Sequence, residues 1–178
     1  SAMTLPSNAS VRQLTINSGS LTIANNSLSV SRSTGNNSTL LIAGGTLTQT
    51  GGSIILNGNF LMTSGAFNQS GGNITLDGND NNTTATSVAS GVALFSLTGG
   101  TPNCSAGTIV IVDPHVNTYS TGSGTNRSVN IGRSAGTAYF TGTHTFVFGD
   151  GVSTTAGNTD GFVLETYSSG YSPVQNVT

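Results

Sequence analysis

The sequence predicts a single all-β domain folded as a right-handed parallel β-helix, or β-solenoid. Three observations lead to this prediction. The first half of the chain repeats itself at an interval of about twenty residues, its apolar residues come in alternating pairs, and glycine and asparagine cluster between the pairs. In a solenoid each turn of chain, called a coil, lies on the previous coil and adds one parallel strand to each of its sheets.

The repeat is clearest where residues 39–58 align with residues 59–78 without a gap. The first stretch is TLLIAGGTLTQTGGSIILNG and the second is NFLMTSGAFNQSGGNITLDG. Equivalent positions of successive coils lie about 4.8 Å apart, so like residues are expected to stack. Gln49 and Gln69 should therefore form an inward-facing amide ladder, which we interpret as structural.

Within each repeat the apolar residues form i, i+2 pairs, which is the period of a strand with one buried face. Three such pairs make one coil, and stacking of coils should bring Ile54 against Ile74. The corners between the pairs carry Gly-Gly, Asn-Gly and Asp-Gly, which turn the chain at low cost. The expected strand pairs are Leu14/Ile16, Leu21/Ile23, Leu28/Val30, Leu40/Ile42, Leu47/Gln49, Ile54/Leu56 and Ile74/Leu76.

Beyond residue 78 the repeat loosens. We expect one domain over 4–178, with regular coils over 4–78 and irregular coils with projecting loops over 79–178, while residues 1–3 have the sequence of a tag remnant. Residues 11–15 are similar in sequence to residues 174–178 near the C-terminus. We therefore expect adjacent repeats of the same long chain to be partners. Later strands are expected at 92–97, 108–112, 129–131, 138–140, 145–148 and 162–164.

Composition excludes several kinds of partner. The 178 residues carry a net charge of −2, and only 6% of them are charged. The basic residues are Arg12, Arg32, Arg127 and Arg133, with no lysine, so no basic patch for nucleic acid is expected. No apolar run reaches the roughly 18 residues of a membrane-spanning helix, so no membrane insertion is expected.

The segments GGTLTQTGGSIILNG and SGAFNQSGGNITLDG resemble repeats of large bacterial surface adhesins. These include filamentous-haemagglutinin-type proteins and the giant surface proteins of gliding Bacteroidota. The resemblance covers residues 11–78 and implies a β-helical stalk that is secreted to the bacterial cell surface and serves cell adhesion or gliding motility. Surface glycans are the candidate ligands, and the resemblance carries over no catalytic residue.

Asp77, Asn79 and Asn81 form the one candidate metal site. They supply alternating oxygen donors, as calcium loops do, but the segment lacks the central glycine and terminal glutamate of an EF-hand loop. A solvated corner is the favoured interpretation, with Ca²⁺ as the metal to test. No other cofactor is expected.

Glu165, Tyr167 and Tyr171 are the candidate glycan contacts. Glu165 and Tyr167 have the strand parity opposite to Leu164, so both are expected to face solvent. Exposed tyrosines beside a carboxylate form a stacking platform for sugar rings. Packing of these rings against loops is the alternative.

An enzyme that acts on polysaccharides, a lyase or a hydrolase, is the main alternative function. Such chemistry needs two placed carboxylates, or a carboxylate with a metal and a basic group. Asp113-Pro114-His115 is the most enzyme-like triplet, but a strand-ending turn explains it without catalysis. We therefore expect no enzyme and no catalytic residue.

An ice-binding solenoid is the third hypothesis. The Thr-x-Thr pattern at Thr46, Thr48 and Thr50 would suit an ordered face, yet the equivalent residues one coil later include Ala66 and Asn68. The threonine ladder is therefore expected to break after one coil.

Two single residues are interpreted as structural. Cys104 is the only cysteine, so no disulfide is available, and a small buried side chain is expected there. His144 has the strand parity of Phe146 and Phe148, so it should point inward or lie at the edge of a coil as a hydrogen-bonded residue.

Overall fold

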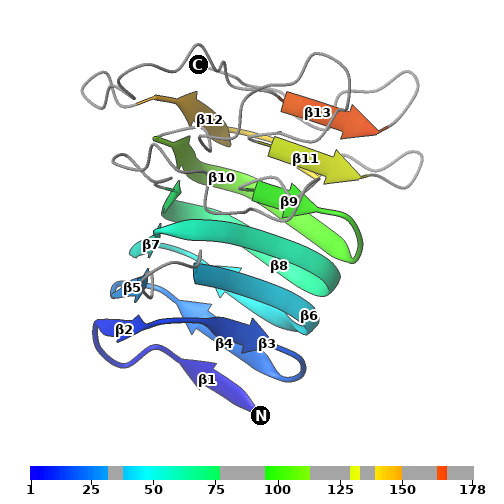
Figure 1. Ribbon diagram of the computed structural model, residues 1–178. Helices are drawn as coiled ribbons and strands as arrows, with labels where there is room; N and C mark the ends of the chain where they lie inside the picture. The colour runs from blue at the N-terminus through cyan, green and yellow to red at the C-terminus, as the bar shows by residue number, and fades with distance from the viewer. Residues whose placement is uncertain (32–37, 77–94, 113–128, 133–138, 150–163, 168–178) are drawn as a thin grey trace, which may run out of the picture.

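A computed structural model describes residues 1–31, 38–76, 95–112, 129–132, 139–149 and 164–167, with the backbone alone at 38, 39 and 164–167. All elements in these ranges are β-strands, and they belong to one 13-stranded sheet. Every strand pairing is parallel. The coils rise from the N-terminus at one end of the stack to β12 and β13 near the other (Figure 1).

The strands form three columns that run along the stack. The first column contains β3 (Leu14–Ile16), the first parts of β6 (Ser38–Gln49) and β8 (Gly58–Leu76), β9 (Phe95–Leu97), β11 (Val129–Gly132) and β13 (Leu164–Tyr167). The second contains β1 (Ala2–Thr4), β4 (Ser20–Ile23), later parts of β6 and β8, and the first part of β10 (Thr101–Ile111). The third contains β2 (Ala9–Val11), β5 (Ser27–Val30), β7 (Ser53–Leu56), the last parts of β8 and β10, and β12 (Thr145–Phe148).

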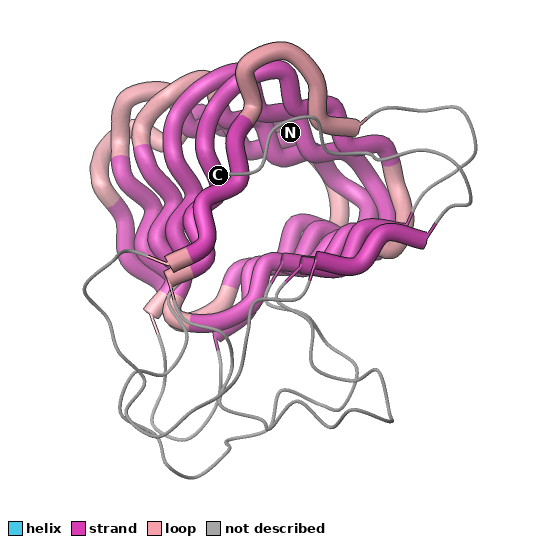
Figure 2. The backbone as a smooth tube through the Cα atoms, turned by 90° about the horizontal axis from the view of Figure 1, so that it is seen from above, coloured by secondary structure: helices cyan, strands magenta, loops and turns pink. Residues whose placement is uncertain are grey.

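The columns curl around a common interior, which Figure 2 shows from above the stack. Strands β6 and β8 each pass from the first column into the second, and their pairing shifts register at this bend. Gly65 lies at the bend with φ of 85°, and a Cβ there would collide with the carbonyl oxygen of Gly45. The small residues of the repeat thus let successive coils turn the same corner in close contact.

The inward residues of the three columns make one continuous core. Phe60, Phe67 and Phe95 are fully buried, and the rings of Phe60 and Phe95 stack with centroids 4.9 Å apart. Parallel stacking is confirmed at the positions on which the sequence prediction depended. Ile54 is paired with Ile74, and Gln49 is paired with Gln69.

The interval between stacked residues differs along the chain. Gln49 and Gln69 are bonded side chain to side chain across 20 positions, whereas Ser27 and Ser53 are bonded across 26. The gapless alignment of 39–58 with 59–78 therefore describes one step of the stack, and the preceding step is longer.

Three strand segments lie where the sequence predicted none: β1, β2 and the first part of β10. The first part of β10 pairs with β8, and Pro102 is in register with Phe67. The next even-numbered residue, Cys104, directs its N–H away from β8, to the carbonyl of Tyr139. Alternate residues of a strand direct their N–H groups to the same side, so the N–H that Pro102 lacks would have pointed away from β8. The pairing of β10 with β8 is therefore intact despite the proline.

The first residues belong to the sheet. Ala2–Thr4 form β1, which pairs with β4 from Ala2 opposite Ser20 to Thr4 opposite Thr22. Residues 1–3 were expected to be a tag remnant outside the fold, but Ala2 and Met3 form part of a paired strand.

Candidate functional site

Most of the residues predicted to form sites lie outside the described part of the chain. This holds for Asp77, Asn79 and Asn81, and for Tyr171. Glu165 and Tyr167 lie in β13, where their backbones pair with Asn130 and Gly132, but their side chains are outside the description.

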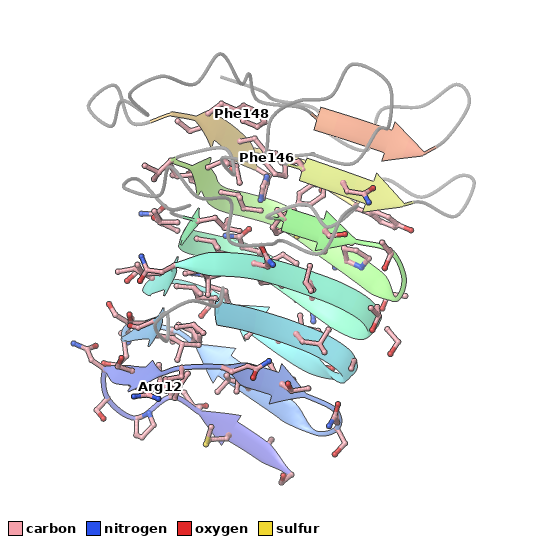
Figure 3. The ribbon with its side chains drawn as sticks, in the orientation of Figure 1. Arg12, Phe146 and Phe148 are labelled. Atoms are coloured by element: carbon pink, nitrogen blue, oxygen red, sulfur yellow. The ribbon has the colours of Figure 1, made fainter. Side chains whose placement is uncertain are left out.

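Asp113 and His115 also fall outside the described residues. So does every other aspartate, and Arg12 is the single arginine whose side chain is described. Arg12 is exposed on the N-terminal coil (Figure 3). Within the described ranges, no three His, Cys, Asp or Glu side chains come together to hold a metal.

The most organised polar group in the described structure is buried inside the stack. We call Gln49, Gln69 and His144 the polar ladder. Gln49 and Gln69 are fully buried and His144 is 2% exposed. Three hydrogen bonds connect the ladder: Gln49 Nε2 to the Asn73 carbonyl at 3.1 Å, Gln69 Nε2 to Gln49 Oε1 at 3.1 Å, and His144 Nε2 to Gln69 Oε1 at 2.8 Å.

Glycines on the next coil make room for the two amides. A Cβ at Gly72 would lie 2.7 Å from Gln49 Nε2, and a Cβ at Gly107 would lie 2.7 Å from Gln69 Nε2. Both glycines also have positive φ, of 78° and 102°. The Gly-Gly corner predicted from the repeat thus has a second role, because it opens space for an inward amide.

The direction of the hydrogen bonds fixes the proton on the histidine. The Asn73 carbonyl accepts only, so Gln49 must direct its Nε2 there and its Oε1 toward Gln69. Gln69 then directs its Nε2 at Gln49, which leaves its Oε1 to accept from His144. We therefore assign a hydrogen to Nε2 of His144, so that this nitrogen donates to Gln69 Oε1.

Burial keeps the imidazole of His144 neutral. Removal from water lowers the pKa of His144 to about 4, so the ring stays neutral near pH 7. Phe140 and Phe146 flank the imidazole, with ring centroids 4.7 and 5.2 Å from it. The expectation of an inward, hydrogen-bonded histidine is confirmed, and its partner is an amide of the predicted ladder.

Cys104 lies directly over Gln69 in the second column and is fully buried. Burial raises the pKa of its thiol above the usual range, so the sulfur is held as the weakly nucleophilic thiol. The predicted structural role of Cys104 agrees with this position.

The outer faces carry ladders of hydroxyls and amides. In the second column Thr22 lies beside Thr48, and Thr48 beside Asn68. Thr46 is followed by Ala66, so the predicted break in the threonine ladder is confirmed. These faces offer many neutral donors and acceptors to a polar ligand.

Sequence reasoning missed the link between His144 and Gln69. The two residues are 75 positions apart and belong to segments with no common repeat. The signal that could have found it is the parity of His144 with Phe146, combined with the need of a buried Gln69 for a further donor.

No helix in the described ranges is long and apolar enough to cross a membrane. Comparison of the chain with protein-family models, with curated proteins and with solved structures found no match.

Proposed function

We propose that this chain is a structural and adhesive stalk segment of a secreted bacterial cell-surface protein, built as a right-handed parallel β-helix with about twenty residues per coil in its first half. The observation that carries the proposal is the stacking of all described strands in parallel over one core. The right hand is supported by the strong preference of parallel β crossovers for that hand.

The surface chemistry supports an attachment role. Hydroxyl and amide side chains follow one another on the outer face of the second column, and the chain carries only 6% charged residues. Such a surface binds neutral polar ligands by hydrogen bonds, which is the chemistry of glycans. We include Glu165, Tyr167 and Tyr171 as the glycan contacts in this proposal.

A glycan array tests the adhesive part. The wild-type chain is expected to retain a defined set of neutral glycans, and replacing Tyr167 and Tyr171 by Ala should abolish that retention. Tyr119→Ala is the matched control and should leave retention unchanged. Absence of binding across the array, or an equal loss in the control, would remove the glycan contacts from the proposal.

Surface display has a separate test. Antibodies against the purified chain should label intact cells of the source bacterium without permeabilisation. Label that appears only after lysis would refute the cell-surface location and leave the fold unaffected.

The enzyme hypothesis would replace this proposal on one result. Release of oligosaccharides from polyuronates, abolished by Asp113→Ala or His115→Ala, would identify a lyase or hydrolase.

Inhibition of ice recrystallisation would favour the ice-binding hypothesis. A rise in melting temperature with Ca²⁺, absent in Asp77→Asn, would assign the corner at Asp77, Asn79 and Asn81 as a metal site.

A further inference from the structure

The outer face of the third column carries two parallel rows of side chains. Residues i and i+2 of a strand lie on the same face, and equivalent residues of successive coils are stacked in register. The row that we call the polar row consists of Ser53, Asn73, Thr108 and Thr145. The row that we call the methyl row consists of Ile55, Thr75, Val110 and Val147. Figure 1 shows β7 and β12, the first and last strands that carry these rows, on the same side of the stack.

Both rows are accessible from solvent. The residues between them, such as Ile54 and Ile74, are fully buried in the core, whereas Ile55 is 41% exposed. Val110 and Val147 are half-buried. Single apolar residues on a surface are ordinary, but an aligned row of aliphatic groups on consecutive coils marks a candidate contact surface.

The two rows are held rigidly. Most of their residues are β-branched, so their χ1 angles are restricted. The backbone of the polar row is also fixed from the interior, because Gln49 Nε2 donates to the Asn73 carbonyl at 3.1 Å. At the end of the row Thr145 Oγ1 donates to the Thr143 carbonyl at 3.4 Å, and its oxygen can still accept. A rigid surface of this kind loses little conformational entropy when it binds a ligand.

The size of the face favours a narrow ligand over a second copy of the chain. Successive coils lie about 4.8 Å apart, and residues i and i+2 of a strand lie about 6.6 Å apart, so the two rows cover on the order of 200 Å². A stable protein interface needs about 800 Å² on each partner. A straight, narrow ligand that lies along the stack axis would contact the whole face.

The chemistry of the face selects a neutral ligand that is polar on one side and apolar on the other. Neither row contains a charged residue, so the face offers no counter-charge to a phosphate or a carboxylate. The polar row supplies hydroxyls and an amide, and the methyl row beside it supplies aliphatic surface. A sugar ring has the same division, because hydroxyls surround its edge and C–H groups form its faces. An unbranched polysaccharide repeats this division along a straight line.

An ice surface fits the two rows less well than a polysaccharide does. Binding to ice would require the same group on successive coils, but the polar row changes from Ser53 to Asn73 and then to Thr108. The methyl row changes from Ile55 to Thr75 in the same way. A saccharide tolerates these changes, because each of its hydroxyls can donate and accept.

We propose that the polar row and the methyl row together bind an unbranched neutral polysaccharide that lies along the stack axis. This inference rests on the proposed adhesive function, and it adds a ligand class and a contact surface separate from Glu165, Tyr167 and Tyr171. A contact of this size holds one oligosaccharide at a dissociation constant of about 1 mM, which is too weak to survive the washes of an array. A long polysaccharide gains strength by binding several copies of the face at once.

An NMR titration of the isotope-labelled chain with neutral linear hexasaccharides, up to about 10 mM, tests the proposal. Cellohexaose, xylohexaose and mannohexaose are the probes. For at least one of them, the shifts of backbone amides should concentrate in β7, the last parts of β8 and β10, and β12. This map uses the wild type, so it tests the site whether or not a variant folds.

A charge placed in the methyl row tests the same site by affinity. Val110→Glu should weaken binding by about tenfold or more, because the carboxylate would lose water against the C–H groups of the sugar. Thr48→Glu is the matched control, because it places the same charge on the outer face of the second column, where Thr48 is also half-buried. It should bind like the wild type.

Several results would overturn the proposal. They are absence of binding to all three hexasaccharides, shifts that concentrate in another column, and an equal loss of affinity in Thr48→Glu. Inhibition of ice recrystallisation that Val110→Glu abolishes and Thr48→Glu preserves would assign the face to ice instead. Array retention that depends on Tyr167 and Tyr171, without shifts in the third column, would remove this inference alone and leave the proposed function in place.

Discussion

Acidification should destabilise this fold through His144. The folded ring has a pKa of about 4 because of burial, against 6.5 for the side chain in water. Between these two values the unfolded chain binds more protons at this residue than the folded chain does. The stability that His144 contributes is therefore complete above about pH 6.5 and is lost as the pH falls toward about 4.

The magnitude follows from the separation of the two pKa values. Each pH unit corresponds to about 1.4 kcal/mol, so a separation of about 2.5 units costs about 3 kcal/mol of unfolding free energy over this range. A typical domain has only about 5 to 15 kcal/mol in total. The effect is thus large enough to move a denaturation midpoint clearly.

Urea unfolding monitored by circular dichroism, at intervals from about pH 7 to about pH 4, measures this loss. The chain also contains six acidic side chains, so the informative quantity is the difference between the wild type and His144→Gln, which lacks the imidazole. His115→Gln removes the other histidine and should keep the wild-type slope. Parallel curves for the wild type and His144→Gln would refute the account of a neutral buried imidazole.

Three further changes test the packing by chemical denaturation. Gln69→Leu removes a hydrogen-bond partner from each of its two neighbours in the polar ladder. It should lower the free energy of unfolding by about 2 to 5 kcal/mol, because each buried polar atom left without a partner costs about 1 to 3 kcal/mol. A variant as stable as the wild type would show that the ladder contributes nothing to stability. Gly107→Ala should destabilise by more than about 1 kcal/mol, since φ is +102°, whereas Gly132→Ala, with a nearest atom 3.3 Å away, should cost less. Phe60→Ala should cost about 3 to 5 kcal/mol and Ile55→Ala about 0.5 or less, and similar losses at both sites would contradict the assigned interior.

The regular part of the fold could be predicted because its information is local and repeated. Ile54 and Ile74 occupy the same place in two aligned segments, and the physics of stacking converts that likeness into contact. The strand at Thr101–Cys104 was hidden because Pro102 is ordinarily a sign against a strand. Its position became interpretable only when the side of the missing N–H was known.

The polar ladder was predictable in part for the same reason. Gln49 and Gln69 belong to the repeat, so their contact follows from alignment. His144 does not belong to it, and no local pattern links it to a residue 75 positions away. The candidate glycan contacts at Glu165 and Tyr167 rest on strand parity alone, which predicts a face but not a ligand.

The orientation of the strand ladders has a mechanical consequence. Hydrogen bonds between parallel neighbours such as β4 and β6 lie along the stack axis. Tension along that axis therefore loads these hydrogen bonds one pair of strands at a time and does not shear all of them together. If the 20 residues that separate Gln49 from Gln69 detached, this segment would lengthen from the stacking distance of about 4.8 Å to about 70 Å of extended chain. A tether made this way would yield in steps at low force and absorb work as it lengthens.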